Sequence, residues 1–219
     1  MIDVLYILAA LPRTGSGLMS DIFNGAGIPT REIYKTDQFA PKLAKKLRAS
    51  GDVIGIKPIF EHMLNRAIQP DKWLDLLIAR IGARRNVWVY MDRHDKVRQA
   101  LSYERAVLLG EWHSFNSVKS LDVEPRTLNV QQRLRWMQQE QLWWAAYFAT
   151  RNITPRRLFY EDWTKDQDAI VGTAEELLHL SGHHYNGQGR MRRKQADSDV
   201  EPYVQQMYED ILRWDVKHN

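Results

Sequence analysis

The feature that most constrains the fold is the stretch 5–19, in which an apolar run stops at a glycine-rich turn. The turn reads Pro-Arg-Thr-Gly-Ser-Gly over residues 12–17, and a helical pattern follows, with Leu18, Ile22 and Phe23 on one face. This order of strand, glycine-rich loop and helix brings backbone N–H groups and the partial positive charge of a helix N-terminus to one point. The stretch therefore predicts a cradle for an anion such as phosphate or sulfate.

Details of the turn support this interpretation. Gly15 and Gly17 let the backbone approach an anion closely, and Arg13 adds a donor for a charge-assisted hydrogen bond. An ordinary strand-to-helix turn has the same short pattern, because glycine motifs of this length also occur by chance. The turn by itself leaves both interpretations open.

Composition narrows the class of protein. The chain has 219 residues, 44% of them hydrophobic and 11% aromatic, which is enough for one folded domain with a full core. It contains no cysteine, which excludes a disulfide framework and fits a reducing compartment. The apolar run 4–11 is too short to cross a bilayer, and only three residues precede it. We therefore expect a cytoplasmic protein with no signal peptide and no membrane span.

The charge of the chain is mildly basic. A net charge of +4 suits an anionic ligand but is too small to indicate nucleic acid, so we expect no nucleic-acid partner. Eight tryptophans are many for this length. They indicate either core packing or a flat aromatic surface for a sugar.

Strand-like and helix-like segments alternate along the chain. Strands are predicted at 4–11, 52–57, 86–91 and 157–160, and 30–34 reads as a loop or a short extended segment. Helices are predicted from residue 18, and at 39–50, 60–68, 72–81, 96–109, 129–151, 168–180 and 203–214. This alternation predicts an α/β fold with a parallel sheet flanked by helices. Ligands of such sheets bind beyond the carboxyl ends of the strands. Charged residues that lie at or just after predicted strand ends are Arg13, Lys57, Arg93 and Glu161.

The longest predicted helix spans 129–151. Asn129 is in position to cap it, with Gln132 three residues later. Apolar residues recur at helical spacing and are expected in the core: Leu134, Met137, Leu142, Trp144 and Phe148.

A second informative stretch is 87–106. Arg93 directly follows a predicted strand, and Ser102 lies nine residues on, inside the next helix. An arginine supplies charge and a hydroxyl supplies a directed hydrogen bond, so the two together suit a phosphate group.

Five motifs occur in a fixed order along the chain. They are Pro-Arg-Thr-Gly-Ser-Gly at 12–17, Arg-His-Asp-Lys-Val-Arg-Gln-Ala-Leu-Ser at 93–102, Gly-Glu-Trp-His at 110–113, Tyr-Glu-Asp at 160–162 and Arg-Lys-Gln-Ala-Asp at 193–197. In this order they resemble the bacterial carbohydrate sulfotransferases of the trehalose sulfotransferase type. That resemblance implies a P-loop-type fold related to nucleotide kinases. It also implies 3′-phosphoadenosine 5′-phosphosulfate (PAPS) as donor.

The resemblance assigns residues to the donor. It implies that the 5′-phosphosulfate is held by Pro12, Arg13, Thr14, Gly15, Ser16 and Gly17. It places the 3′-phosphate at Arg93 and Ser102, with Arg193 and Lys194 closing over the nucleotide. It further implies a carbohydrate or glycolipid acceptor and a homodimer. The expected organisation is one sulfotransferase domain over 1–219, with 181–219 as a basic C-terminal extension packed on it.

The chain departs from the family pattern at two places. The family loop usually reads Pro-Arg-Ser-Gly-Ser-Thr, whereas this chain has Thr14 for the first serine and Gly17 for the final threonine. The substrate-side pattern Gly-x-Pro-x-Glu has one additional residue before Glu32.

Sulfuryl transfer between two oxygens requires a cation and a base. Arg13 is the predicted cation at the bridging oxygen of the donor, with Lys57 second. Glu32 is the predicted base for the acceptor hydroxyl, with His62 and His113 as alternatives. Trp112 and His113 are expected on the substrate side. No metal is expected, since the histidine and carboxylate spacing matches no metal site.

Two other functions remain open on the sequence. A small-molecule kinase would need a lysine in its phosphate loop, and residues 12–17 contain none. A protein of the same fold that binds a nucleotide without turnover is the second alternative, which Gly17 and the shifted Glu32 would explain.

Overall fold

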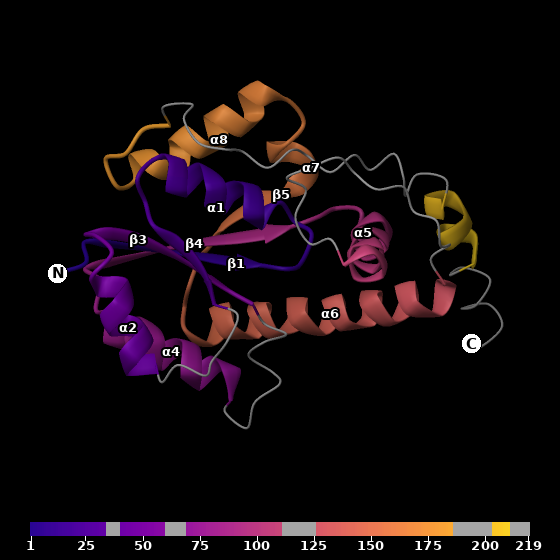
Figure 1. Ribbon diagram of the computed structural model, residues 1–219. Helices are drawn as coiled ribbons and strands as arrows, with labels where there is room; N and C mark the ends of the chain where they lie inside the picture. The colour runs from indigo at the N-terminus through magenta and orange to yellow at the C-terminus, as the bar shows by residue number, and fades with distance from the viewer. Residues whose placement is uncertain (34–39, 60–68, 111–125, 186–202, 211–219) are drawn as a thin grey trace.

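The computed structural model describes residues 1–33, 40–59, 69–110, 126–185 and 203–210, and the statements below concern these. One sheet of five parallel strands runs through the molecule (Figure 1). Its order is β2 (Thr30–Ile33), β3 (Val53–Pro58), β1 (Val4–Ala10), β4 (Arg85–Asp92) and β5 (Arg156–Phe159). Every neighbouring pair is parallel, which confirms the predicted fold class.

Helices cover both faces of the sheet. In chain order they are α1 (Ser16–Gly25), α2 (Ala40–Arg48), α4 (Pro70–Ile81), α5 (Lys96–Leu109), α6 (Thr127–Thr150), α7 (Tyr160–Trp163) and α8 (Gln167–His179). Figure 1 shows α1 and α8 on one face and α2, α4 and α6 on the other. None of the helices in the ranges given above is long and apolar enough to cross a membrane.

The alternation of side chains along β1 builds two hydrophobic cores. Leu5 and Ile7 pack with the helices of one face in what we call the first core. Val4, Tyr6 and Leu8 pack with α1 and α8 on the opposite face in the second core. All seven residues of β1 are buried, because helices cover the central strand on both sides. This explains why the sequence shows a continuous apolar run here and no polar alternation.

The order of the strands marks the place for a ligand. After β1 the chain builds β2 and β3 on one side of it, and then β4 and β5 on the other. The carboxyl end of β1 therefore lies at the point where the direction of winding reverses, which is where open α/β sheets bind ligands. The glycine-rich loop starts at this point.

The described tryptophan side chains lie in the hydrophobic cores or pack against them. Trp144 and Trp163 are buried, as is Trp73, and the other described tryptophans (Trp88, Trp136 and Trp143) pack partly buried against the first core. The core-packing explanation is confirmed for these six, while Trp112 and Trp214 lie outside the described residues.

Of the two alternatives left open for 30–34, the extended segment is confirmed for 30–33, which form the edge strand β2 and complete hydrogen bonding along β3. Two other local predictions were wrong. Asn129 does not cap α6, which begins at Thr127. Its amide instead donates to Glu104 Oε1 at 2.6 Å. Leu142 is not core, because 70% of its surface is exposed.

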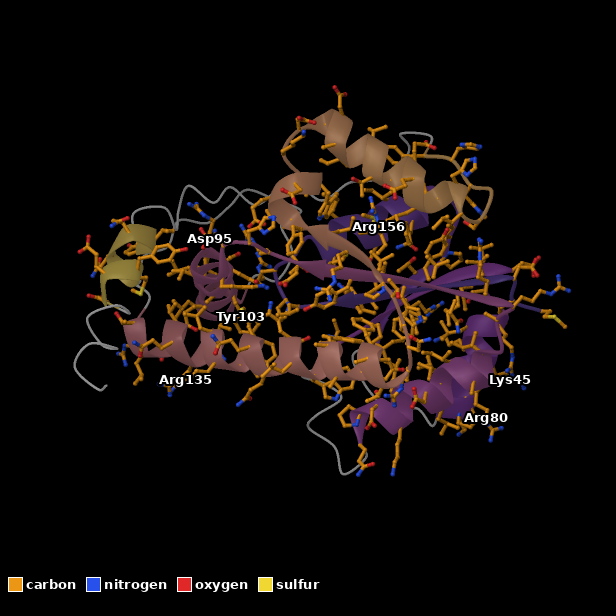
Figure 2. The ribbon with its side chains drawn as sticks, turned by 180° about the vertical axis from the view of Figure 1, so that it is seen from behind. Lys45, Arg80, Asp95, Tyr103, Arg135 and Arg156 are labelled. Atoms are coloured by element: carbon orange, nitrogen blue, oxygen red, sulfur yellow. The ribbon has the colours of Figure 1, made fainter. Side chains whose placement is uncertain are left out.

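Residues 203–210 form a helical segment that packs against α5 and α6. We call this the C-terminal segment. Its Val204 and Met207 are buried in the first core. The Tyr208 hydroxyl donates to Asp95 Oδ1 at 3.0 Å, and Figure 2 shows Asp95 where the segment lies beside α5. The remaining part of 181–219 is mostly outside the described residues, so the predicted division of the chain stays a prediction.

The burial of Met207 predicts that the C-terminal segment contributes to the stability of the fold. We expect Met207→Ala to lower the free energy of unfolding by about 2 kcal/mol or more, because it leaves a cavity in the core. Gln206→Ala changes an exposed neighbour in the same helical turn and should have almost no effect. Urea unfolding of both variants measures the difference, and equal stabilities would show that the segment does not pack on the core.

Candidate active site

The loop after β1 has a backbone conformation that few sequences tolerate. Arg13 has φ +63° and Gly15 has φ +78°, both in the left-handed region. Gly15 precedes α1, and in the described part of the chain no side chain caps this helix. The first turn of α1 also carries no acidic residue. The backbone N–H groups in the first turn of a helix have no partner within the helix, so this end of α1 has the arrangement that the sequence predicts for an anion site.

Two aromatic side chains from α7 close against this loop. A Cβ atom at Gly15 would lie 2.6 Å from the Trp163 ring and 2.9 Å from the Tyr160 ring. Such distances are far below van der Waals contact, so glycine is required at this position for two independent reasons: its φ angle and the space available. The position of α7 thus fixes the shape of the loop.

Two buried polar side chains form hydrogen bonds to backbone carbonyl groups in and just before the loop. The hydroxyl of Thr14, which is fully buried, donates to Leu11 O at 2.7 Å. The amide Nε2 of Gln99, from α5, donates to Pro12 O at 2.6 Å. The Thr14 hydroxyl therefore closes the turn, and α5 is tied to the turn directly.

Arg13, expected at the 5′ end of the donor, lies next to Ser102, expected at the 3′-phosphate. Arg13 Nε donates to Ser102 Oγ at 3.1 Å, which joins the loop to the middle of α5. The two residues are 89 positions apart in the chain. Contact between a loop arginine and a helix hydroxyl brings one cation and one directed donor to a single point.

Arg93 lies at the carboxyl end of β4 and is almost fully buried. Its Nε donates to Glu161 Oε1 at 3.0 Å, and its guanidinium lies 4.4 Å from the centre of the Tyr160 ring. Glu161 also accepts from the His94 backbone N–H at 2.9 Å. Burial alone would raise the pKa of the Glu161 carboxyl, but the hydrogen bonds from His94 N–H and Arg93 outweigh burial and lower this pKa. Glu161 is therefore an ionised partner of Arg93.

Glu32 and Lys57 form an ion pair across β2 and β3. They are register partners in the two strands, and their side chains are only 13% and 5% exposed. Ile33 and Ile56, their neighbours in the two strands, belong to the core on the other face. Because side chains alternate along strands, Glu32 and Lys57 both point to the face that α1 covers.

A family model for Stf0 sulphotransferase matches residues 37–210 of the chain, which is well over half of it. The chain belongs to the Stf0 sulphotransferase family. Membership of this family supports sulfotransferase activity and confirms the resemblance drawn from the sequence motifs. A comparison with curated proteins found no match.

Two solved structures similar to this chain are de novo designed proteins with the P-loop NTPase fold. The first is 12% identical, with a TM-score of 0.39, and the match covers 83% of this chain and 93% of the designed one. The second is 13% identical, with a TM-score of 0.30, and covers 64% and 91%. At these values the comparison adds nothing about function, and the fold assignment depends on the sheet itself.

The structure brings the described site residues to one edge of the sheet. Residues 12–17 follow β1, Lys57 and Glu32 lie at the ends of β3 and β2, and Arg93 follows β4. The predicted residues His62, Trp112, His113, Arg193 and Lys194 lie outside the described residues. Among the residues that are described, no group of histidines and carboxylates has the arrangement of a metal site.

Three residues of this site were not predicted from the sequence. Tyr160 and Trp163 shape the loop, and Gln99 holds its carbonyl. One signal was present for Gln99: it precedes Ser102 by three positions, so the two share a face of one helix. For Trp163 no local signal exists, because its contact with Gly15 joins two distant parts of the chain.

The crowding at Gly15 gives a test with a matched control. Gly27 has nearly the same backbone angle, φ +83°, but a Cβ there would meet no described atom within 4 Å. We expect Gly27→Ala to cost about 1 kcal/mol of unfolding free energy from the backbone alone. Gly15→Ala should cost about 1–3 kcal/mol more, because Trp163 must move. Urea unfolding measures both, and equal costs would contradict the close packing of α7 on the loop.

Proposed function

We propose that this protein transfers a sulfuryl group from PAPS to a hydroxyl of a carbohydrate or glycolipid. The observation that carries the proposal is the hydrogen bond between Arg13 and Ser102. It joins the loop expected to hold the 5′-phosphosulfate to the residue expected to hold the 3′-phosphate. A donor with phosphate groups at both positions suits a site in which these residues are in contact.

The residues present fit such a donor. Gly15 allows the left-handed turn that directs the chain into α1, and α1 offers its N-terminal N–H groups. Arg13 contributes charge at the loop, and Arg93 contributes charge at the end of the neighbouring strand β4. The bound donor would supply an activated sulfuryl group attached to a phosphate leaving group.

The chain itself supplies the acid–base and electrostatic parts of the reaction. Glu32 takes the proton of the acceptor hydroxyl while that oxygen bonds to sulfur. Arg13, with Lys57 second, provides positive charge for the oxygen from which sulfur departs. Contact with Lys57 favours the ionised form of Glu32, which is the form able to accept a proton.

Nucleotide binding by an Arg93 variant tests whether the donor carries a 3′-phosphate. We expect wild-type protein to bind 3′-phosphoadenosine 5′-phosphate much more tightly than AMP, because Arg93 and Ser102 hold the 3′-phosphate. Arg93→Ala should weaken binding of the first ligand by about 1.5–3 kcal/mol and leave AMP nearly unchanged. Calorimetry with both ligands measures this. Arg156→Ala, an exposed arginine on β5, serves as control. Equal affinities of the wild type for the two nucleotides would overturn the assignment.

A substitution of Glu32 tests whether this residue is the base for the acceptor hydroxyl. We expect Glu32→Gln to lower turnover by about 10²–10⁴-fold, the usual contribution of a positioned base. Donor affinity should change little, because glutamine keeps the shape and an oxygen for Lys57. The melting temperature should fall, because Lys57 is only 5% exposed and loses its charged partner, so turnover is compared per folded protein. Glu176→Gln alters an exposed carboxylate and should act like wild type. Turnover is measured with labelled donor and a panel of glycans and glycolipids.

The outcomes distinguish the alternatives. If Glu32→Gln keeps wild-type turnover while His62→Ala or His113→Ala abolishes it, the histidine is the base. If the wild type binds the nucleotide but transfers nothing to any acceptor, the protein is a nucleotide-binding member of the family. Transfer from ATP with a requirement for magnesium would instead identify a kinase.

A further inference from the structure

We infer that Gln99 is a positioning residue that holds the loop 12–17 in the shape required for the donor. The inference depends on the proposed function only in that this loop binds the 5′ end of the nucleotide. Gln99 is the point at which α5 holds the backbone of the loop. Its role differs from that of Ser102, which lies one turn further along α5.

The first observation is burial. Gln99 is an amide with none of its surface exposed, and burying such a group is costly unless it is hydrogen-bonded. Its Nε2 donates to Pro12 O at 2.6 Å, across 87 positions of the chain. The bond therefore satisfies a buried donor and fixes one carbonyl of the loop at the same time.

The second observation fixes the orientation of the amide. Lys96 Nζ lies 3.5 Å from Gln99 Oε1, and an ammonium group can only donate. Lys96 is itself held by an ion pair with Asp92, and Asp92 accepts from Gln141 Nε2 at 2.7 Å. The oxygen of Gln99 thus faces Lys96 and its NH₂ faces the loop. A chain of polar contacts runs from α6 through β4 and α5 to Pro12.

The third observation is the strained residue next to Pro12. Arg13 adopts φ +63°, a conformation that is unfavourable in a residue other than glycine and persists only when neighbours hold it. Gln99 binds the carbonyl just before Arg13, and Ser102 binds the Arg13 side chain. One face of α5 therefore holds both the backbone and the side chain of this part of the loop.

The experiment compares Gln99→Met with Glu104→Gln. Methionine keeps the length of the side chain but cannot donate to Pro12 O. Glu104 is as deeply buried on the same helix, but its partners Asn129 and Arg133 are on α6, away from the loop. Melting temperatures of both variants report any general loss of stability. Gln99→Glu is the second variant, since a carboxylate keeps a partner for Lys96 without donating to the loop.

The first measurement is hydrogen exchange of the ligand-free protein, which does not depend on any assumed reaction. We expect backbone amides of 13–19 to exchange about 5- to 10-fold faster in Gln99→Met than in wild type. The Met19 N–H, which donates to Gly15 O, is a reporter in this stretch. Glu104→Gln should leave the stretch unchanged. Unchanged exchange in both Gln99 variants would overturn the inference.

The second measurement is calorimetry with AMP and with 3′-phosphoadenosine 5′-phosphate. Gln99→Met should weaken both by a similar factor, about 5- to 10-fold, because the loop contacts the 5′ end that they share. Ser102→Ala should weaken the second ligand more than AMP, because Ser102 is expected at the 3′-phosphate as well as beside Arg13. A loss confined to the 3′-phosphorylated ligand in Gln99→Met would overturn the inference. If wild-type protein binds neither ligand, the proposed function fails, while the exchange experiment still decides the role of Gln99.

Discussion

The left-handed backbone at Arg13 and Gly15 is the constraint on which the site depends. It turns the chain from the central strand β1 into α1, and it leaves the first N–H groups of that helix for an anion. Neighbouring elements hold this shape from two sides. Trp163 of α7 fills the space where a side chain at residue 15 would lie, and Gln99 of α5 binds Pro12 O. The loop is therefore a product of packing as much as of its glycines.

Each described cation expected at the site already has a specific partner. Arg13 contacts Ser102, Lys57 pairs with Glu32, and Arg93 pairs with Glu161. Buried charges require such partners, because an uncompensated charge inside a protein is costly. The paired residues are spread along the edge of the sheet: the proposed base Glu32 and its lysine lie at β2 and β3, and the residues proposed to bind the nucleotide lie after β1 and β4 and on α5.

The sequence predicted an element well where its pattern is strong and local. Residues 96–109 show a helical pattern after a good N-cap residue, and α5 has these bounds, with Asp95 accepting from Arg98 N–H. Residues 30–33 are too few to show alternation, so the edge strand β2 was not distinguished from a loop. Leu142 follows the apolar period of α6 but faces outward, because no described element covers that side of the helix. The spacing of apolar residues along a helix does not show whether another element covers the face on which they lie.

The sequence by itself determined the parallel α/β class, the glycine-rich loop after the first strand and the family, because these depend on short stretches read in order. It also named Glu32, Lys57, Arg13, Arg93 and Ser102, and it paired Arg93 with Ser102. Which of them meet was decided by the tertiary structure: Glu32 with Lys57, and Arg13 with Ser102. The physical reason is that these contacts depend on the order of strands in the sheet and on the packing of α5 and α7, which no local pattern encodes.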